Sequence, residues 1–183
     1  MKALYVLPSR LLLAAALLFG LAACNEPEQN EKGLDPVAFQ AGDECHVCGM
    51  VISDFPGPKG EVVEKGKVRK FCSPAEMLGW WLQPENRNLH AKLYVHDMAR
   101  SRWEEPDDNY LIDATSAYYV AGTQLKGAMG AVLATFAEEA DAKRLAAEQG
   151  GRVLRFDELD QTVLQPAAAM HDMSAHQQAH AEH

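Results

Sequence analysis

The sequence CHVCGM at residues 45–50 restricts the fold and the chemistry of this chain more than any other stretch. It places the sulfur atoms of Cys45, Cys48 and Met50 within one short segment. Such a segment has to fold so that the sulfurs serve a redox disulfide, one corner of a zinc site or a site for a soft copper ion. The residues around the motif discriminate among these three kinds of site.

A redox-active CxxC pair works best at the start of a helix, where the helix dipole lowers the pKa of the first thiol. Here Gly49 and the strand-like stretch MVISDF follow the motif, and no βαβ pattern precedes it. Both features disfavour a disulfide oxidoreductase that uses Cys45 and Cys48, which stays as one alternative. Cys72 makes the count of cysteines after residue 24 odd, which also disfavours a purely structural disulfide scaffold.

A structural zinc ion needs four ligands. Cys45, Cys48 and Cys72 together with a histidine such as His46 or His96 could supply them. The second half of this site would lack the paired spacing that zinc sites usually have, because the segment FCS contains a single cysteine. A zinc-stabilised interaction module is the second alternative.

Copper(I) favours thiolate and thioether ligands, and the pattern CxxCxM offers both. If a strand follows Gly49, the side chains of Met50 and Ile52 lie on one face of it. Methionine is also a common filler of hydrophobic cores. The residues alone therefore leave Met50 open as a copper ligand or a core residue.

The first residues indicate export. Residues 1–23 have a basic start and an apolar run at 11–23, which is typical of a secretory signal and too short to favour spanning a bilayer. The run ends in LAAC, which resembles a bacterial lipobox, so Cys24 is the predicted lipidation site and first mature residue. Asn25 in place of aspartate points to the outer membrane. Residues 24–42 are acidic and contain proline and glycine, which predicts a flexible tether.

The charge balance disfavours nucleic acid as a partner. Residues 1–23 carry two bases and no acid, so the mature chain keeps 15 bases against 26 acids and the net charge falls from -9 to -11. Nucleic-acid-binding domains are usually basic. The sequence also lacks a Ser/His/Asp set, a pair of acid carboxylates and a phosphate-binding loop, so we expect no enzymatic activity.

The pattern of apolar residues and turns indicates an α+β fold of two similar β-β-α-β modules packed side by side, at residues 43–106 and 107–164. In the first module, Ser73 can cap a helix that begins at Pro74 and runs to about Leu82. Its strands are predicted at residues 50–52, at 67–71 and from Lys92, with the turn FPGPKG after the first.

The second module is predicted to repeat this order. A helix AEEADAKRLAAEQ ends at Gly150, and strands are predicted in YLIDATSAYYV, at residues 131–136 and in GRVLRFDEL. Residues 165–183 form a low-complexity tail rich in histidine and methionine, which predicts disorder. The tail residues that could hold an auxiliary metal ion are Met170, His171, Met173 and His176.

The ordered set of motifs resembles the nitrous oxide reductase accessory lipoproteins, the NosL family. After the lipobox come CHVCGM, KFCSPAEML, YVHDMARSRW, SAYYV, ATFAEEADA and GGRVLRFDEL, from Cys45 to about Leu159. The resemblance implies a lipid-anchored copper chaperone at the periplasmic face of a bacterial membrane, with two β-β-α-β modules likened to treble-clef domains. It implies Cu(I) as the ion, and nitrous oxide reductase apoprotein and an ABC-type maturation transporter as partners.

The resemblance also suggests ligands. The CxxCGM match makes Cys45, Cys48 and Met50 expected copper ligands, and the segment KGAMGAVLATF adds Met129 from the second module. His96 in YVHD is either an imidazole ligand or a histidine that only stabilises its strand.

Two further features stand outside the family pattern. Cys72 ranks below the motif cysteines because the pattern does not require it, and the His/Met-rich tail is an addition of unassigned role. A site shared between the two modules could release its ion when the modules shift.

Overall fold

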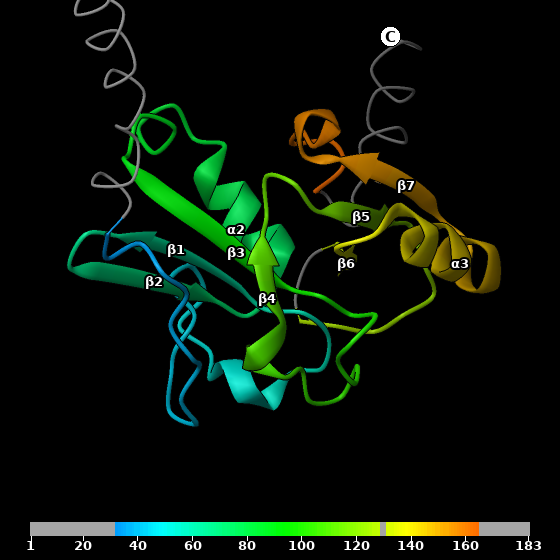
Figure 1. Cartoon of the computed structure of the whole chain (residues 1–183), viewed down its shortest axis with the longest axis horizontal. Helices are drawn as coiled ribbons and strands as arrows, with labels where there is room; N and C mark the ends of the chain where they lie inside the picture. Colours follow the sequence, from blue (N-terminus) through cyan, green and yellow to red (C-terminus); the bar gives the residue numbers. More distant parts are fainter. Residues whose placement is uncertain (1–31, 129–130, 165–183) are drawn as a thin grey trace, which may run out of the picture. The chain divides into compact units, whose positions relative to one another are not determined.

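Two antiparallel sheets, each with a helix packed against it, form the part of the chain that the computed structural model describes, residues 32–128 and 131–164 (Figure 1). The first sheet has the strand order β2-β1-β3-β4, and the second has the order β6-β5-β7. The first-sheet region contains η1 (Ile52–Asp54), β1 (Gly60–Glu64), β2 (Lys67–Phe71), α2 (Pro74–Trp81), β3 (Ala91–His96), η2 (Asp108–Tyr110) and β4 (Leu111–Asp113). The second contains β5 (Tyr118–Ala121), β6 (Leu133–Phe136), α3 (Glu139–Gln149), β7 (Arg152–Arg155) and η3 (Phe156–Glu158).

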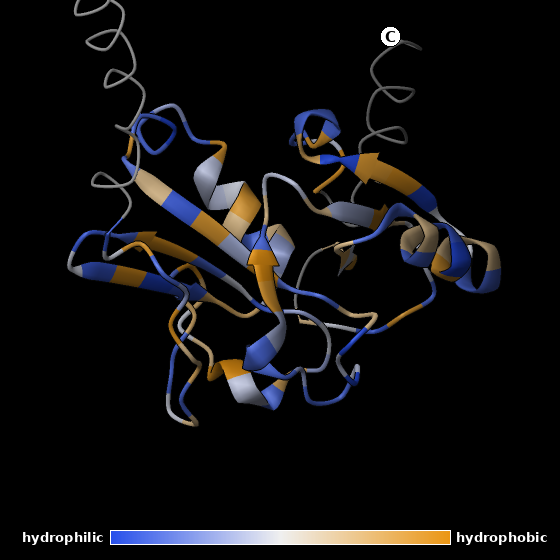
Figure 2. Ribbon diagram, viewed as in Figure 1, coloured by the Kyte–Doolittle hydropathy of each residue, from blue (hydrophilic) through white to orange (hydrophobic). Residues whose placement is uncertain are grey.

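The predicted α+β class and the repeated order are confirmed, as β1-β2-α2-β3 and β5-β6-α3-β7. The boundary between the halves differs from the predicted one. Strand β4 pairs with β3, with Tyr94 opposite Asp113, so the first sheet extends beyond residue 106. In Figure 2, apolar and polar residues alternate along β3, but β1 and β3 are buried on both faces over most of their length.

The first hairpin lies elsewhere than the sequence pattern indicates. Residues 50–52 form only the bridge between Glu44 and Val51, followed by η1, and the strand that pairs with β2 is β1. Gly60 reads as part of a turn but is the first residue of β1. Glycine is suited to this position because a β-carbon there would lie 2.9 Å from the side chain of Met77. The missing side chain lets α2 pack closely on the sheet.

Helix α2 begins where its local signals predict. Ser73 Oγ accepts a hydrogen bond of 3.2 Å from the backbone N–H of Glu76, and Pro74 occupies the first turn. Met77 and Leu78 are fully buried in the core. The cap therefore also fixes the position of the residue before Ser73, at the end of β2.

The larger of two hydrophobic clusters among the described residues runs through both halves. It includes Val62 and Leu78 from the first half and Tyr119 and Leu133 from the second. Thr135 of β6 reinforces this junction, because its hydroxyl donates a hydrogen bond of 2.6 Å to the carbonyl oxygen of His96. The continuous core joins the two modules into one packed unit.

Residues 34–39, called the strap below, lie across the first sheet. Leu34 is buried, with 3% of its surface exposed. Four hydrogen bonds hold the strap: Tyr94 Oη to Leu34 O, Val37 N to Glu61 Oε1, Phe39 N to Asp108 Oδ2 and Lys70 Nζ to Ala38 O. The folded unit thus begins at Gly33. A flexible tether was predicted for residues 24–42, but the strap within this range is fixed by its hydrogen bonds and by the burial of Leu34. No helix among the described residues is long and apolar enough to cross a membrane.

Candidate metal centre

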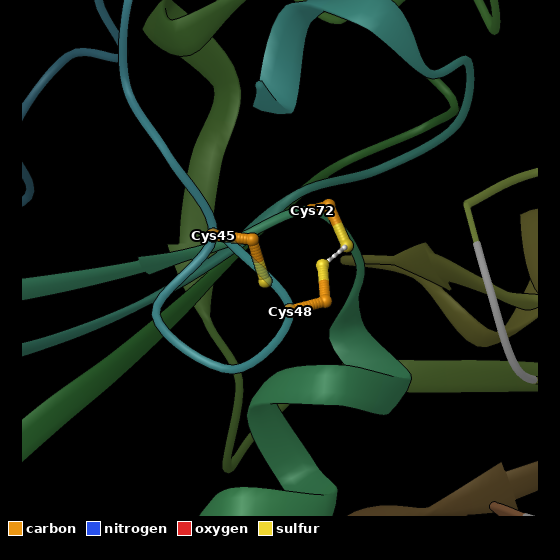
Figure 3. Close-up of side chains that lie close together, drawn as sticks. All are labelled: Cys45, Cys48 and Cys72. Carbon is orange, nitrogen blue, oxygen red and sulfur yellow. Dashed lines mark hydrogen bonds between the residues drawn. The ribbon is translucent and has the colours of Figure 1, made fainter. Parts of the chain in front are cut away.

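Three thiols from two separate segments converge at one end of the first sheet. The Sγ atoms of Cys45, Cys48 and Cys72 all lie within 4.8 Å of one another, and those of Cys48 and Cys72 are 3.7 Å apart (Figure 3). Among the described residues, this is the one group of three or more histidine, cysteine or acidic side chains placed to hold a metal ion.

Residues 45–50, called the motif loop below, form a closed turn. The backbone N–H of Cys45 donates to the carbonyl oxygen of Met50, and that of Gly49 donates to the carbonyl oxygen of Cys45, both at 2.8 Å. Gly49 has a φ of +71°, a conformation that favours glycine over other residues. The glycine of CHVCGM is therefore needed to turn Cys48 back toward Cys45.

Cys72 reaches the motif loop from the junction between β2 and α2 (Figure 3). The backbone N–H of His46 donates a hydrogen bond of 2.8 Å to the carbonyl oxygen of Lys70, which attaches the loop to β2 beside Cys72. Cys72 ranked below the motif cysteines as a predicted copper ligand, yet it lies in the cluster with them. Its position directly before the helix cap Ser73 was the available signal, because that cap fixes where the strand ends.

The thiols perturb one another. Hydrogen bonds from the Cys72 thiol and, to a smaller extent, from nearby backbone amides lower the pKa of Cys45 to about 4, against the opposing effect of burial. The same contact, together with burial, raises the pKa of Cys72. In the metal-free cluster, Cys72 therefore holds its proton more tightly than Cys45 does. A soft cation would displace that proton when it binds.

The cluster is covered on the core side and opens at the motif loop. Cys45 and Cys72 are buried, whereas Cys48 is half-buried and Val47 is exposed. The ring of His46 packs edge-on against Phe71, at 5.8 Å between centroids. A ligand from another molecule could therefore approach the cluster from the side of Cys48.

His96 does not belong to the cluster. It is 1% exposed, its Nδ1 atom accepts a hydrogen bond of 3.1 Å from the backbone N–H of Lys59, and its Nε2 atom lies 2.9 Å from Asp108 Oδ1. Both ring nitrogens are thus engaged in holding β1, β3 and η2 together. This arrangement supports the structural interpretation of His96 over the ligand interpretation.

Of the remaining predicted site residues, the structure describes only Met50. Met50 lies in the motif loop and is half-buried. The others lie outside the described residues, so their roles stay predictions: Cys24, Met129, Met170, His171, Met173 and His176.

Comparisons with known proteins agree with this geometry. The sequence model of the family described as NosL matches residues 36–164. The copper-binding lipoprotein NosL of Stutzerimonas stutzeri is 66% identical over 179 residues, which cover 98% of this chain and 94% of that protein. The copper-binding lipoprotein NosL of Achromobacter cycloclastes is 31% identical over 163 residues, covering 86% and 83%.

A solved structure has the same fold. The crystal structure of the copper chaperone NosL from Shewanella denitrificans matches with a TM-score of 0.68 and 40% identity, over 70% of this chain and 98% of that chain. The names of these relatives describe binding proteins and chaperones, which agrees with the expectation that this chain is not an enzyme.

Proposed function

The chain belongs to the NosL family, and on that basis we propose that it is a periplasmic copper(I) chaperone that supplies copper for the copper-sulfide centre of nitrous oxide reductase. The observation that carries the proposal is the convergence of Cys45, Cys48 and Cys72 at the exposed motif loop. Two of its relatives are named copper-binding lipoproteins and a third is named a copper chaperone.

The chemistry of the cluster supports Cu(I) over zinc. Three thiolates suit the soft Cu(I) ion, and Met50 in the same loop offers a thioether as a further ligand. Structural zinc requires four ligands, usually cysteine or histidine. No histidine or acidic residue joins the three thiols among the described residues.

Release of the ion is proposed to proceed by ligand exchange. Release through a shift between the two modules is opposed by the continuous core through Val62 and Tyr119. All three clustered thiols come from the first half, and the half-buried Cys48 is the most accessible of them. An acceptor ligand would replace Cys48 first, after which the more deeply buried thiols would give up the ion in turn.

The proposed location follows from the predicted lipobox and from the relatives' names. Cys24 is the proposed lipid anchor, at the periplasmic face of the membrane, and the proposed partners are the apo form of nitrous oxide reductase and an ABC-type maturation transporter. Replacement of Cys24 by serine tests the anchor. We expect this variant to leave the membrane fraction, and retention as tight as the parent's in high salt would contradict the anchor.

The metal itself is tested by competition between ions. Reduced protein is loaded under anaerobic conditions with equal amounts of Cu(I) and Zn(II), separated from unbound ions and analysed for metal content. We expect one equivalent of copper and little zinc, followed by transfer of the copper to apo nitrous oxide reductase. One equivalent of zinc in place of copper would overturn the proposal.

A further inference from the structure

The turn and second strand of the hairpin beside the motif loop, residues 65–70, are basic although the chain is acidic. Four of the 17 lysine and arginine residues lie within KGKVRK, residues 65–70. Two of them are neutralised by the protein itself, because Arg69 pairs with Glu64 and Lys70 pairs with Asp43. The other two, Lys65 and Lys67, are exposed and make no ion pair within the described part of the chain. These two positive charges remain available to another molecule.

The hairpin and the motif loop share one face of the molecule. Residues two apart on a strand point to the same side, so Lys67 lies on the same face as Arg69. The guanidinium group of Arg69 lies 4.8 Å from the ring centroid of Trp80, and that ring packs at 5.6 Å against His46 of the motif loop. Lys67 therefore belongs to the surface around the mouth of the cluster.

Val47 supplies an apolar contact at the same mouth. It is 51% exposed and, with Val37, is one of two exposed large hydrophobic residues among those described. A single exposed valine is ordinary on a protein surface. Its place between Cys45 and Cys48 gives it significance, because an acceptor ligand that reaches Cys48 has to approach across this loop.

We propose that Val47 and Lys67, extended by Lys65 in the adjoining hairpin turn, form a docking face for the protein that accepts the metal, and that the accepting surface is acidic around an apolar contact for Val47. This inference rests on the proposed function. The net negative charge of this protein would repel an acidic acceptor at long range, and a local basic patch would orient their encounter so that the motif loop faces the acceptor. The patch would thus act mainly on the association rate.

The lysines also have a simpler interpretation. Strand β2 is at the edge of its sheet, and lysine on an edge strand hinders pairing with strands of other molecules. Glutamate at these positions would protect the edge equally well, since either charge does so, but it would repel an acidic acceptor. Reversal of the charge therefore separates docking from edge protection.

The test uses the double variant Lys65→Glu/Lys67→Glu. Its matched control is Arg87→Glu/Lys126→Glu, which reverses two exposed basic residues that lie outside KGKVRK in the sequence and have no ion pair among the described residues. Transfer of Cu(I) to apo nitrous oxide reductase is timed at low and high salt, and the Cu(I) affinity of each variant is measured by competition with a chelator. We expect transfer from the first variant to be about tenfold slower at low salt, with a smaller difference at high salt because salt screens the charges. Affinities for Cu(I) should match the parent's, and the control should transfer at close to the parent's rate.

Association of the metal-free proteins is measured separately by calorimetry, so the docking face is tested even if the parent proves not to hold copper. Equal slowing in both double variants would overturn the inference, because net charge alone would then explain the effect. Unchanged transfer and association in Lys65→Glu/Lys67→Glu would also overturn it and leave edge protection as the role of the lysines. The inference is also overturned if Lys65→Glu/Lys67→Glu loses binding to anionic lipid vesicles but keeps the parent's rates of transfer and association.

Discussion

The sulfur atoms of Cys48 and Cys72 lie 3.7 Å apart, although 24 positions separate the residues in the chain. Their contact joins the motif loop to the junction of β2 and α2, so the cluster is a property of the fold and not of the CxxC motif alone. Cys72 is therefore expected to matter for metal binding as much as the two motif cysteines.

Replacement of Cys72 by serine tests this expectation. Because the variant loses a thiolate ligand, we expect its Cu(I) affinity to fall by more than about 10- to 100-fold, the loss typical of removing a supporting residue near a metal. The measurement is anaerobic competition with a Cu(I) chelator. Ser73→Ala is the control, since it removes the helix cap and about 1 kcal/mol of stability but no ligand. Affinity equal to the parent's in Cys72→Ser would exclude Cys72 from the site.

The thioether of Met50 is expected to distinguish copper from zinc. Met50→Leu keeps the approximate volume and removes the sulfur, so Cu(I) binding should weaken by about 1 to 3 kcal/mol while zinc binding and the melting temperature of the metal-free protein change little. Met129→Leu is the parallel variant for the second half. If both variants hold Cu(I) as tightly as the parent in chelator competition, neither methionine is a ligand.

His96 is expected to act on stability and not on copper. His96→Ala would leave Asp108 Oδ1 and the backbone N–H of Lys59 without their buried partner, at a cost of about 2 to 4 kcal/mol of unfolding free energy. Urea unfolding of the metal-free protein measures this loss, and chelator competition should show the parent's affinity. A stable His96→Ala variant that no longer binds Cu(I) would instead identify a ligand.

Glu61 makes the stability of the fold depend on pH. Burial raises the pKa of this carboxyl from its ordinary value of 4.5 to about 7, and its Oε2 atom has no hydrogen-bond partner among the described residues. Between those two pH values the folded state holds a proton that the unfolded state has lost. The contribution of Glu61 to stability therefore falls as pH rises from about 4.5 to about 7, and it is constant above that range.

Glu61→Gln removes this dependence and retains an acceptor for Val37. We expect the difference in unfolding free energy between variant and parent to shift in favour of the variant by up to about 3 kcal/mol across that range. Urea titrations of the metal-free proteins at several pH values measure the difference. The pH dependence that comes from the thiols is the same in both proteins, so it drops out of this difference. A difference independent of pH would show that the Glu61 carboxyl has the same pKa in the folded and unfolded states.

Local signals predicted the elements that local interactions build. The cap at Ser73, the helix after it and the end of α3 at Gly150 are all where the sequence places them. Strand β1 was missed because its evidence is not local: Gly60 accommodates Met77, and Glu61 is buried in a strand whose sequence reads as polar. Sequence patterns cannot distinguish such a glycine from one in a turn.

The candidate site shows the same limit. Cys45 and Cys48 were identified from their CxxC spacing, and the turn at Gly49 directly after them brings the two side chains together. The position of Cys72 depends on how the motif loop attaches to β2, and the role of His96 depends on partners from β1 and η2. Both relationships link residues that are distant in the chain, so no local pattern carries them.

The strap also limits how far the protein can search for its partners. Because the strap is attached to the sheet, only residues 25–32 separate Cys24 from the folded unit, and a stretch of this length reaches about 30 Å at most when fully extended. With the proposed lipid on Cys24, the protein would stay within a thin layer next to the membrane. This confinement would raise its effective concentration relative to other membrane-bound proteins. Insertion of a long flexible segment before Gly33 would lower this effective concentration without altering any contact in the folded protein.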